Sequence, residues 1–136
     1  MSKSDADANS RIQLTDPPEL ITKKIRKAVT DSTSLITYDP ENRPGVSTLL
    51  DIDSACTNRD PEEISEICLM KSLDTGEYKK EVARVLIEHL KPIQKKYLEI
   101  VNDRAYLQKC LNEGASKANE IASKNYEEIC KVIGMR

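Results

Sequence analysis

The stretch EYKKEVARVLIEHLKPIQKKYLEIV, residues 77–101, decides the fold because it is the longest segment with a sustained helical period. Apolar residues recur in it every three or four positions, as on one face of an α-helix. They are Tyr78, Val82, Val85, Leu86, Leu90, Ile93, Tyr97 and Ile100. Pro92 lacks a backbone N–H, so we predict a kink there. His89 shares the stripe, and because the sequence does not identify a Ser, Cys or carboxylate as its catalytic partner, we predict a half-buried histidine and not a catalytic one.

Three shorter helices are predicted before this segment, over about residues 17–29, 45–56 and from residue 61. Asp16 and Asp60 each precede proline and an acidic residue, the signature of an N-cap followed by a favourable first turn. The residues expected to face inward are Ile21, Ile25, Ala28, Val29, Val46, Leu49, Leu50, Ala55, Ile64, Ile67 and Cys68.

A last helical region begins at Asn102-Asp103 and ends at Gly134, with Gly114 as its one soft point. Its helical period is carried by Leu107, Leu111, Ala115, Ala118, Ile121, Ala122, Ile129 and Ile133. The segment 10–14 alternates polar and apolar residues and is expected to be extended. The sequence therefore predicts an all-α bundle of about five helices, residues 17–136, preceded by a loop and extended linker, residues 1–16.

Charge and composition exclude several classes of protein. The 136 residues carry a net charge of −2, which is not the footprint of a protein that grips nucleic acid over its whole surface. Lys23, Lys24, Arg26 and Lys27 cluster within five positions, and we interpret the cluster as a solvated helix face. No run of about 18 apolar residues could span a membrane.

The four cysteines contain no C-x-x-C pair and there is one histidine, so we predict no metal site. Each cysteine falls on an apolar stripe, which indicates a small buried thiol in a reducing compartment.

The first four residues, Met1-Ser2-Lys3-Ser4, are the candidate site. Two hydroxyls, one ammonium and free backbone N–H groups suit the phosphates of a nucleotide. Taken by itself, this tetrapeptide fits a disordered, phosphorylatable N-terminus better than a phosphate-binding loop.

An ordered series of stretches along the whole chain resolves that choice. They are Met1–Asp5, Lys24–Ser32, Tyr38–Pro40, Arg43–Ser47 with Leu49-Leu50, Leu86–Glu88, Pro92–Gln94, Tyr97, and Gly114-Ala115 with Lys117-Ala118. The series resembles the C-terminal part of the tryptophanyl-tRNA synthetase family, class I aminoacyl-tRNA synthetases, most nearly of the bacterial and mitochondrial type. Met1 to Ser4 match the last four residues of that family's Lys-Met-Ser-Lys-Ser motif.

The resemblance implies a role for each part of the chain. Met1, Ser2, Lys3 and Ser4 would bind ATP, supplied with Mg²⁺ as a substrate, and Lys3 would be catalytic by stabilising the departing pyrophosphate. The helical part would read the anticodon of tRNA(Trp), although no motif assigns the contacts. The exposed cations available on the last two long helices are Lys95, Lys96, Arg104, Lys109, Lys117 and Lys124, and a solvated face accounts for most of them. No tightly bound cofactor is implied.

The family's nucleotide-binding parallel sheet and tryptophan pocket have no counterpart in these residues, so we predict that the chain alone is inactive. It is either a portion of a tryptophan-tRNA ligase, acting with the missing catalytic domain in a homodimer, or a stand-alone helical module that binds tRNA or a protein. A docking patch on residues 17–56 would favour the portion, and Ile21, Ile25, Val46, Leu49 and Leu50 look unaltered for that purpose. The likeness suggests a mitochondrial matrix or bacterial-type cytoplasmic location. Asn58 replaces a glycine of many relatives, a change that bears on a turn.

Overall fold

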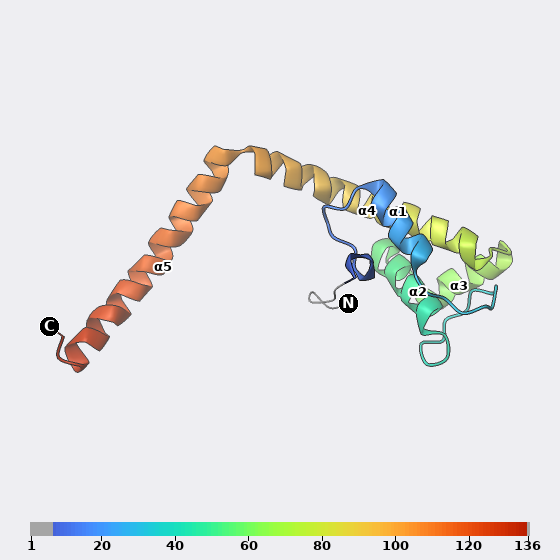
Figure 1. Cartoon of the computed structure of the whole chain (residues 1–136), viewed down its shortest axis with the longest axis horizontal. Coiled ribbons are helices and arrows are strands. Elements are labelled where there is room, and N and C mark those ends of the chain that lie inside the picture. The colour runs from blue at the N-terminus through green and yellow to red at the C-terminus, as the bar shows by residue number, and fades with distance from the viewer. Residues whose placement is uncertain (1–6, 136) are drawn as a thin grey trace. The chain divides into compact units, whose positions relative to one another are not determined.

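The computed structural model describes residues 7–135, which form five α-helices after a single 3₁₀ turn (Figure 1). The elements are η1 (Ala8–Ser10), α1 (Pro18–Lys27), α2 (Pro44–Thr57), α3 (Pro61–Met70), α4 (Thr75–Asn102) and α5 (Arg104–Val132). No strand occurs among these residues, so the predicted all-α class is confirmed. The chain divides after Gln94, inside α4, into two compact units. The boundary suggested after residue 16 stays a prediction.

Side-chain caps fix the starts of α3 and α4. Asp60 is the N-cap of α3, as predicted, and accepts a hydrogen bond from the Glu62 N–H at 3.1 Å. Asp74 and Glu77 form a reciprocal capping box at α4, with the Glu77 N–H donating to Asp74 Oδ1 at 2.7 Å and the Asp74 N–H donating to Glu77 Oε2 at 3.3 Å. The prediction for α1 is wrong by one residue, because Pro17 is the N-cap and the Asp16 carboxylate is engaged elsewhere.

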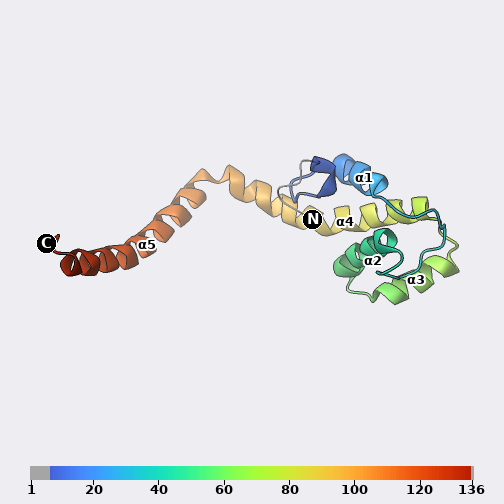
Figure 2. The same ribbon diagram turned by 60° about the horizontal axis from the view of Figure 1, so that its bottom comes forward.

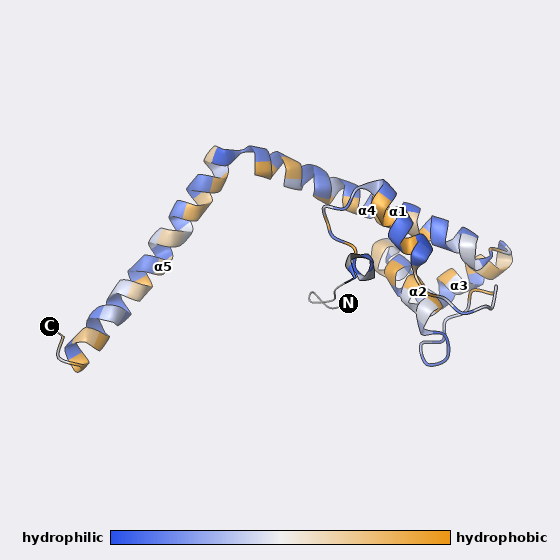
Figure 3. Ribbon diagram, in the orientation of Figure 1, coloured by the Kyte–Doolittle hydropathy of each residue, from blue (hydrophilic) through white to orange (hydrophobic). Residues whose placement is uncertain are grey.

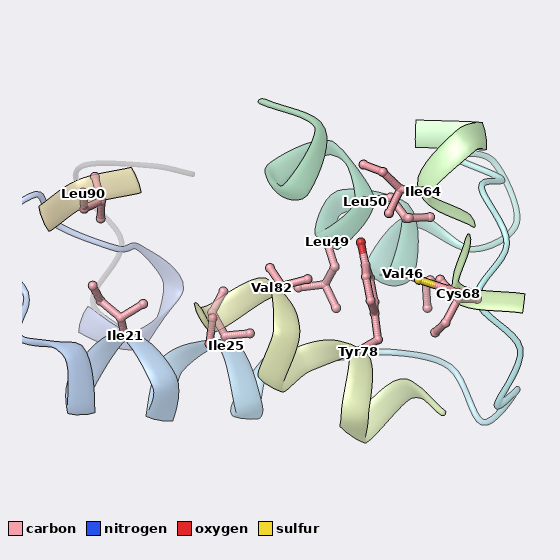
Figure 4. Close-up of a cluster of buried hydrophobic side chains, with 12 residues drawn as sticks. Ile21, Ile25, Val46, Leu49, Leu50, Ile64, Cys68, Tyr78, Val82 and Leu90 are labelled. Carbon is pink, nitrogen blue, oxygen red and sulfur yellow. The ribbon is translucent and has the colours of Figure 1, made fainter. Parts of the chain in front are cut away.

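A closed hydrophobic core holds the first unit together, with Tyr78 of α4 at its centre (Figure 4). Figure 2 shows α1 on one side of α4 and α2 with α3 on the other. The buried members of this core are Ile21, Ile25, Ile36, Val46, Leu49, Leu50, Ile64, Cys68, Tyr78, Val82, Ala83 and Leu90. Ile36, from the loop after α1, is fully buried although no sequence pattern predicted its burial.

The core also shows where the predicted inward faces were wrong. Val29 is 88% exposed because α1 ends at Lys27, two residues before it. Ala55 is exposed, and Asp53 is buried instead, because the covered face of α2 follows the spacing of Val46, Leu49 and Leu50 to position 53.

The five residues chosen as an exposed docking patch are at most 3% exposed. They form the chain's own core, so they cannot also form an exposed patch on which a missing domain docks. The inference that they favour a portion of a ligase over a stand-alone module is therefore wrong. The five residues are Ile21, Ile25, Val46, Leu49 and Leu50.

His89 is exposed, which contradicts the prediction that it is half-buried. The covered face of α4 changes along the helix: Tyr78 and Val82 meet α2 and α3, whereas Leu90 faces Ile21 of α1 (Figure 4). His89 lies between these two covered parts of α4 and lines an open cavity. The helix runs through Pro92 without interruption, and the kink at that residue stays a prediction.

The second unit contains the end of α4 and the whole of α5. Hydrophobic and hydrophilic residues alternate along α5 (Figure 3), and its helical segment continues through Gly114. Gly134 has a φ of 73° and ends the helix as predicted. The Met135 N–H donates to the Cys130 carbonyl at 2.9 Å, and the Gly134 N–H donates to the Lys131 carbonyl at 3.4 Å, which is a Schellman cap.

The thiols follow the prediction only in part. All four cysteines are free, and Cys68 and Cys130 are buried. Cys56 is half-buried and Cys110 is exposed, so the prediction that every cysteine is buried is wrong for Cys110. Among the described residues no helix is both long and apolar enough to cross a membrane.

Candidate functional site

The predicted site residues Met1, Ser2, Lys3 and Ser4 lie outside the described residues. The structure begins with the segment that follows them. Asp7 caps the η1 turn, and its Oδ1 accepts from the Asn9 N–H at 2.8 Å and from Asn9 Nδ2 at 2.7 Å. The hydrogen bond from the Asn9 backbone is the main reason that the pKa of Asp7 is lowered.

A buried ion pair ties this N-terminal segment to the helices. Lys24 Nζ lies 2.5 Å from Asp16 Oδ2, and both side chains are at most 7% exposed. The Gln13 N–H also donates to Asp16 Oδ2, at 3.0 Å. Burial acts to raise the pKa of Asp16, but the hydrogen bonds from Lys24 and Gln13 outweigh it and the pKa is lowered. The prediction that the whole basic cluster forms a solvated face is therefore wrong for Lys24.

Gln94 of α4 provides a second anchor. Its Nε2 donates to the carbonyls of Leu14 and Asp16, each at 2.9 Å, across about 80 residues of sequence. Together with the Asp16–Lys24 pair, these bonds fix the path of the chain between η1 and α1.

The anchored segment borders a cavity of about 580 Å³. Its walls come from η1 and the following residues, the end of α1 and the start of α2, and they are mainly apolar: Ile12, Ile25, Ala28, Val29, Leu49 and Ile52. Asp7, Arg11 and Lys27 also line the cavity and give it a charged margin.

Arg43 organises the loop between α1 and α2. Its guanidinium donates to both carboxylate oxygens of Asp31, at 2.9 and 3.0 Å, and to the carbonyls of Thr33 and Leu35. A further bond reaches Thr37 Oγ1 at 2.5 Å. The hydrogen bond from Arg43 is the main reason that the pKa of Asp31 falls to about 2. This network shapes the loop that carries Ile36 into the core.

Close backbone contact explains the glycine that follows this loop. A Cβ atom at Gly45 would lie 2.3 Å from the Val29 carbonyl oxygen, a distance that a real Cβ does not reach. The first turn of α2 can therefore pack on the chain after α1 only because residue 45 has no side chain.

A second cavity, of about 320 Å³, lies where α2, α3 and α4 meet. The buried Asp53 lines it and accepts a hydrogen bond from Tyr78 Oη at 3.2 Å. Burial raises the pKa of Asp53, and it raises the pKa of the nearby Cys68 thiol to about 11. At neutral pH Cys68 is thus a protonated thiol with little nucleophilic character.

The described residues contain no group of three His, Cys, Asp or Glu side chains that could hold a metal ion. The lining of the second cavity includes Cys56, Cys68 and His89, and among the described residues no hydrogen bond joins either thiol to His89.

The exposed cations follow the sequence prediction in most positions. Lys23, Arg26 and Lys27 are exposed on α1. On the last two helices every candidate cation is exposed as well: Lys95, Lys96, Arg104, Lys109, Lys117 and Lys124. Lys96 pairs with Glu99 and Lys109 with Glu113 within one helical turn, as on a solvated face.

Sequence reasoning missed the buried polar residues of the site. Lys24 lies three residues after Ile21, so its place on the buried stripe was visible in the helical period. Asp53 follows Leu49 and Leu50 at helical spacing and was visible in the same way. The contacts of Arg43 with a loop up to 12 residues away carry no periodic signal.

Comparisons with known proteins agree with this architecture. Residues 1–91 match the family tRNA synthetases class I (W and Y). The chain is 39% identical over 135 residues to tryptophan–tRNA ligase of Bacillus anthracis and 43% identical over 135 residues to that of Helicobacter pylori, covering 99% of this chain and 40% of each relative. It is 42% identical over 134 residues to the tryptophan–tRNA ligase of Rickettsia conorii, covering 98% of this chain and 40% of that protein.

Structural similarity leads to the same family. The crystal structure of tryptophanyl-tRNA synthetase from Mycoplasma pneumoniae superposes with a TM-score of 0.72 at 27% identity, over 98% of this chain and 40% of that one. The chain spans about 40% of the length of the relatives it matches and corresponds to their C-terminal part. It belongs to the family of class I tRNA synthetases for tryptophan and tyrosine, on the tryptophan side of that family.

Proposed function

We propose that this chain supplies the phosphate-binding loop and the tRNA-binding helices of a tryptophan–tRNA ligase. The full reaction would be ATP-dependent activation of tryptophan and its transfer to tRNA(Trp), carried out together with a nucleotide-binding domain. The observation that carries this proposal is the 39–43% identity to tryptophan–tRNA ligases over 98–99% of the chain.

In this proposal the residues Met1 to Ser4 meet the phosphates of Mg²⁺-bound ATP. Tryptophan attacks the α-phosphate, and negative charge develops on the departing pyrophosphate. Lys3 neutralises that charge, while Ser2, Ser4 and backbone N–H groups orient the phosphates. Loss of one such pre-placed donor typically costs about 3–4 kcal/mol of transition-state stabilisation, or about 10²–10³-fold in rate.

The anchors behind this loop support the assignment. Gln94 and the buried Asp16–Lys24 pair hold the segment that leads from the loop into α1. A loop that must close on a nucleotide needs a fixed point at its base, because motion there would move the donors away from the phosphates. The helices would in turn connect this loop to the part that contacts tRNA.

The partners of the complete enzyme belong to the same proposal. They are tRNA(Trp), the catalytic domain and, in a homodimer, a second copy. The relatives named above are bacterial proteins. The location, mitochondrial matrix or bacterial-type cytoplasm, stays a prediction.

One observation favours the alternative, a stand-alone helical module without catalysis. The first unit closes its core without help, because Val46, Leu50 and Val82 are all 0% exposed. Such a unit could fold and bind tRNA or a protein on its own.

The deciding experiment is the intact mass of the native protein, isolated with an antibody against α5. A synthetase-sized species with tryptophan-dependent ATP–pyrophosphate exchange is expected, and Lys3→Ala should lower that exchange by about 10²–10³-fold. Lys80→Ala, at an exposed position of α4, is the matched control and should leave exchange unchanged. A lone 15.3 kDa species without exchange would exclude the ligase and establish the stand-alone module.

A further inference from the structure

The basic face of α1 lies outside the hydrophobic core. Lys23, Arg26 and Lys27 follow one another at positions i, i+3 and i+4, so they project from one face of the helix. That face is opposite the one that buries Ile21 and Ile25 in the core. All three cations are exposed.

Some cations of the first unit have a carboxylate partner, and Lys23, Arg26 and Lys27 are not among them. Lys24 pairs with Asp16, Arg43 with Asp31, and Arg84 with Glu81 and Glu88. Within residues 7–135, no ion pair includes Lys23, Arg26 or Lys27, although the chain as a whole carries more acidic than basic residues.

The acids near this face are few. Glu19 lies on the same helix one turn before Lys23, and Asp7 is close enough to Lys27 for the lysine to lower the pKa of Asp7 slightly. By contrast, Lys117 and Lys124 of α5 each have a glutamate three or four residues away on both sides. The face of α1 is therefore a local excess of positive charge, whereas α5 is a balanced mixture.

Helix stabilisation explains only part of this arrangement. Arg26 and Lys27 occupy the last turn of α1, where cations interact favourably with the helix dipole. Lys23 lies a turn earlier, where that effect has faded. The dipole also gives no reason for three cations to share one face that has so few acidic neighbours.

We propose that the face formed by Lys23, Arg26 and Lys27 binds the sugar–phosphate backbone of tRNA. The proposal rests on the proposed function for the identity of the nucleic acid, and it adds the surface and the chemistry of contact. Long, flexible cations without base-reading partners contact phosphates, which fix the position of an RNA without reading its sequence. This face should therefore position tRNA and leave anticodon discrimination to other residues.

The test measures tRNA(Trp) binding by the full protein as a function of salt concentration. The triple variant Lys23→Gln/Arg26→Gln/Lys27→Gln should lower the slope of log K against log salt by about two to three, and affinity at about 0.1 M salt on the order of 100-fold. A non-cognate tRNA should lose affinity by the same factor, because phosphate contacts are independent of sequence. The helical circular dichroism signal should be unchanged, since the three side chains are exposed.

A matched triple variant on α5 controls for net charge. Lys109→Gln/Lys117→Gln/Lys124→Gln removes the same charge from exposed positions and should change affinity only a few-fold. If the wild-type protein binds tRNA and both triple variants share its salt slope, the proposed face is wrong while the proposed function stands. If the wild-type protein binds no tRNA, both proposals fail. If the α1 triple variant retains tRNA binding but loses binding to polyglutamate, the face binds an acidic protein partner and the proposal is overturned.

Discussion

The first unit and helix α5 both have apolar residues at helical spacing, but the two regions bury these side chains to very different extents. Leu50 of α2 is 0% exposed, whereas Leu111 of α5, on an equally regular stripe, is 68% exposed. The first unit reverses direction several times within 94 residues, so each apolar face meets another. Helix α5 continues for 29 residues without a reversal. A helical period therefore predicts a helix, but burial depends on what the chain brings against it.

The polar contacts of the two regions differ in the same way. In the first unit, Ser65 Oγ donates to the Ile36 carbonyl at 2.9 Å, and Lys79 Nζ donates to the Ala28 carbonyl at 2.8 Å, over 29 and 51 residues. The side-chain pairs within α5 join residues only four positions apart, such as Lys109 and Glu113. Tertiary contacts thus stabilise the first unit, while α5 relies on local helix interactions, each worth about 0.2–0.5 kcal/mol.

The largest difference should come from the ion pairs. Lys24→Met leaves the Asp16 carboxylate buried without its partner, and we expect a loss of about 3–5 kcal/mol in the free energy of unfolding. Lys109→Met breaks an exposed pair and should cost at most about 0.5 kcal/mol. Urea denaturation of both variants measures the two losses. The double variant Asp16→Leu/Lys24→Met should recover much of the first loss, because no charge then remains buried.

A second comparison uses the same substitution in both regions. Leu50→Ala should reduce the free energy of unfolding by about 2–5 kcal/mol, because it opens a cavity in a closed core. Leu111→Ala should change it by no more than about 0.5 kcal/mol. Thermal unfolding of the two variants tests the difference. Equal losses would mean that α5 is covered in solution, and the contrast between the two regions would be wrong.

A third pair of variants should have effects of opposite sign. Gly45→Ala places a methyl group against the Val29 carbonyl, so we expect a loss of about 1–3 kcal/mol. Gly114→Ala has no neighbouring atom within 4 Å and removes a glycine from a helix interior, so it should stabilise α5 by about 1 kcal/mol. Circular dichroism melts read both effects. A destabilising Gly114→Ala would indicate a close neighbour of α5 in solution.

Sequence reasoning predicted helices better than it predicted their faces. The stop at Gly134 and the cap at Asp60 are local, so each could be predicted from a few neighbouring residues. Ile36 lies in a loop without period, and its burial depends on Arg43, Asp31 and distant helices. Local signals cannot contain such contacts.

The candidate site shows the same difference between what local sequence signals predict and what tertiary contacts decide. The role of Lys3 follows from resemblance to a family motif and lies outside the described residues, so it stays a prediction. Lys24 was assigned to a solvated face because it sits among other cations, although its period marked it as buried. Where charge and period disagree, the period was the better guide at Lys24 and at Asp53, since both side chains find a polar partner inside the core.

The smallest predicted effect concerns acid stability and the Arg43–Asp31 pair. The pKa of Asp31 is about 2 in the folded chain, against an ordinary value of 3.8, so the ionised carboxylate stabilises the fold. A lowered folded-state pKa gives stability that is fully present above about pH 4 and is lost as the pH falls through about 2. Arg43→Gln removes the cation, so we expect a shallower fall in melting temperature between pH 5 and pH 2 than in the wild type.

Asp31→Asn should give the same shallower profile, because the titrating group is gone. Asp16 contributes a fall of the same sign in all three proteins, so the difference between profiles isolates Asp31. Parallel profiles would mean that the pair does not persist in solution, and the ordered loop that carries Ile36 into the core would then need another support.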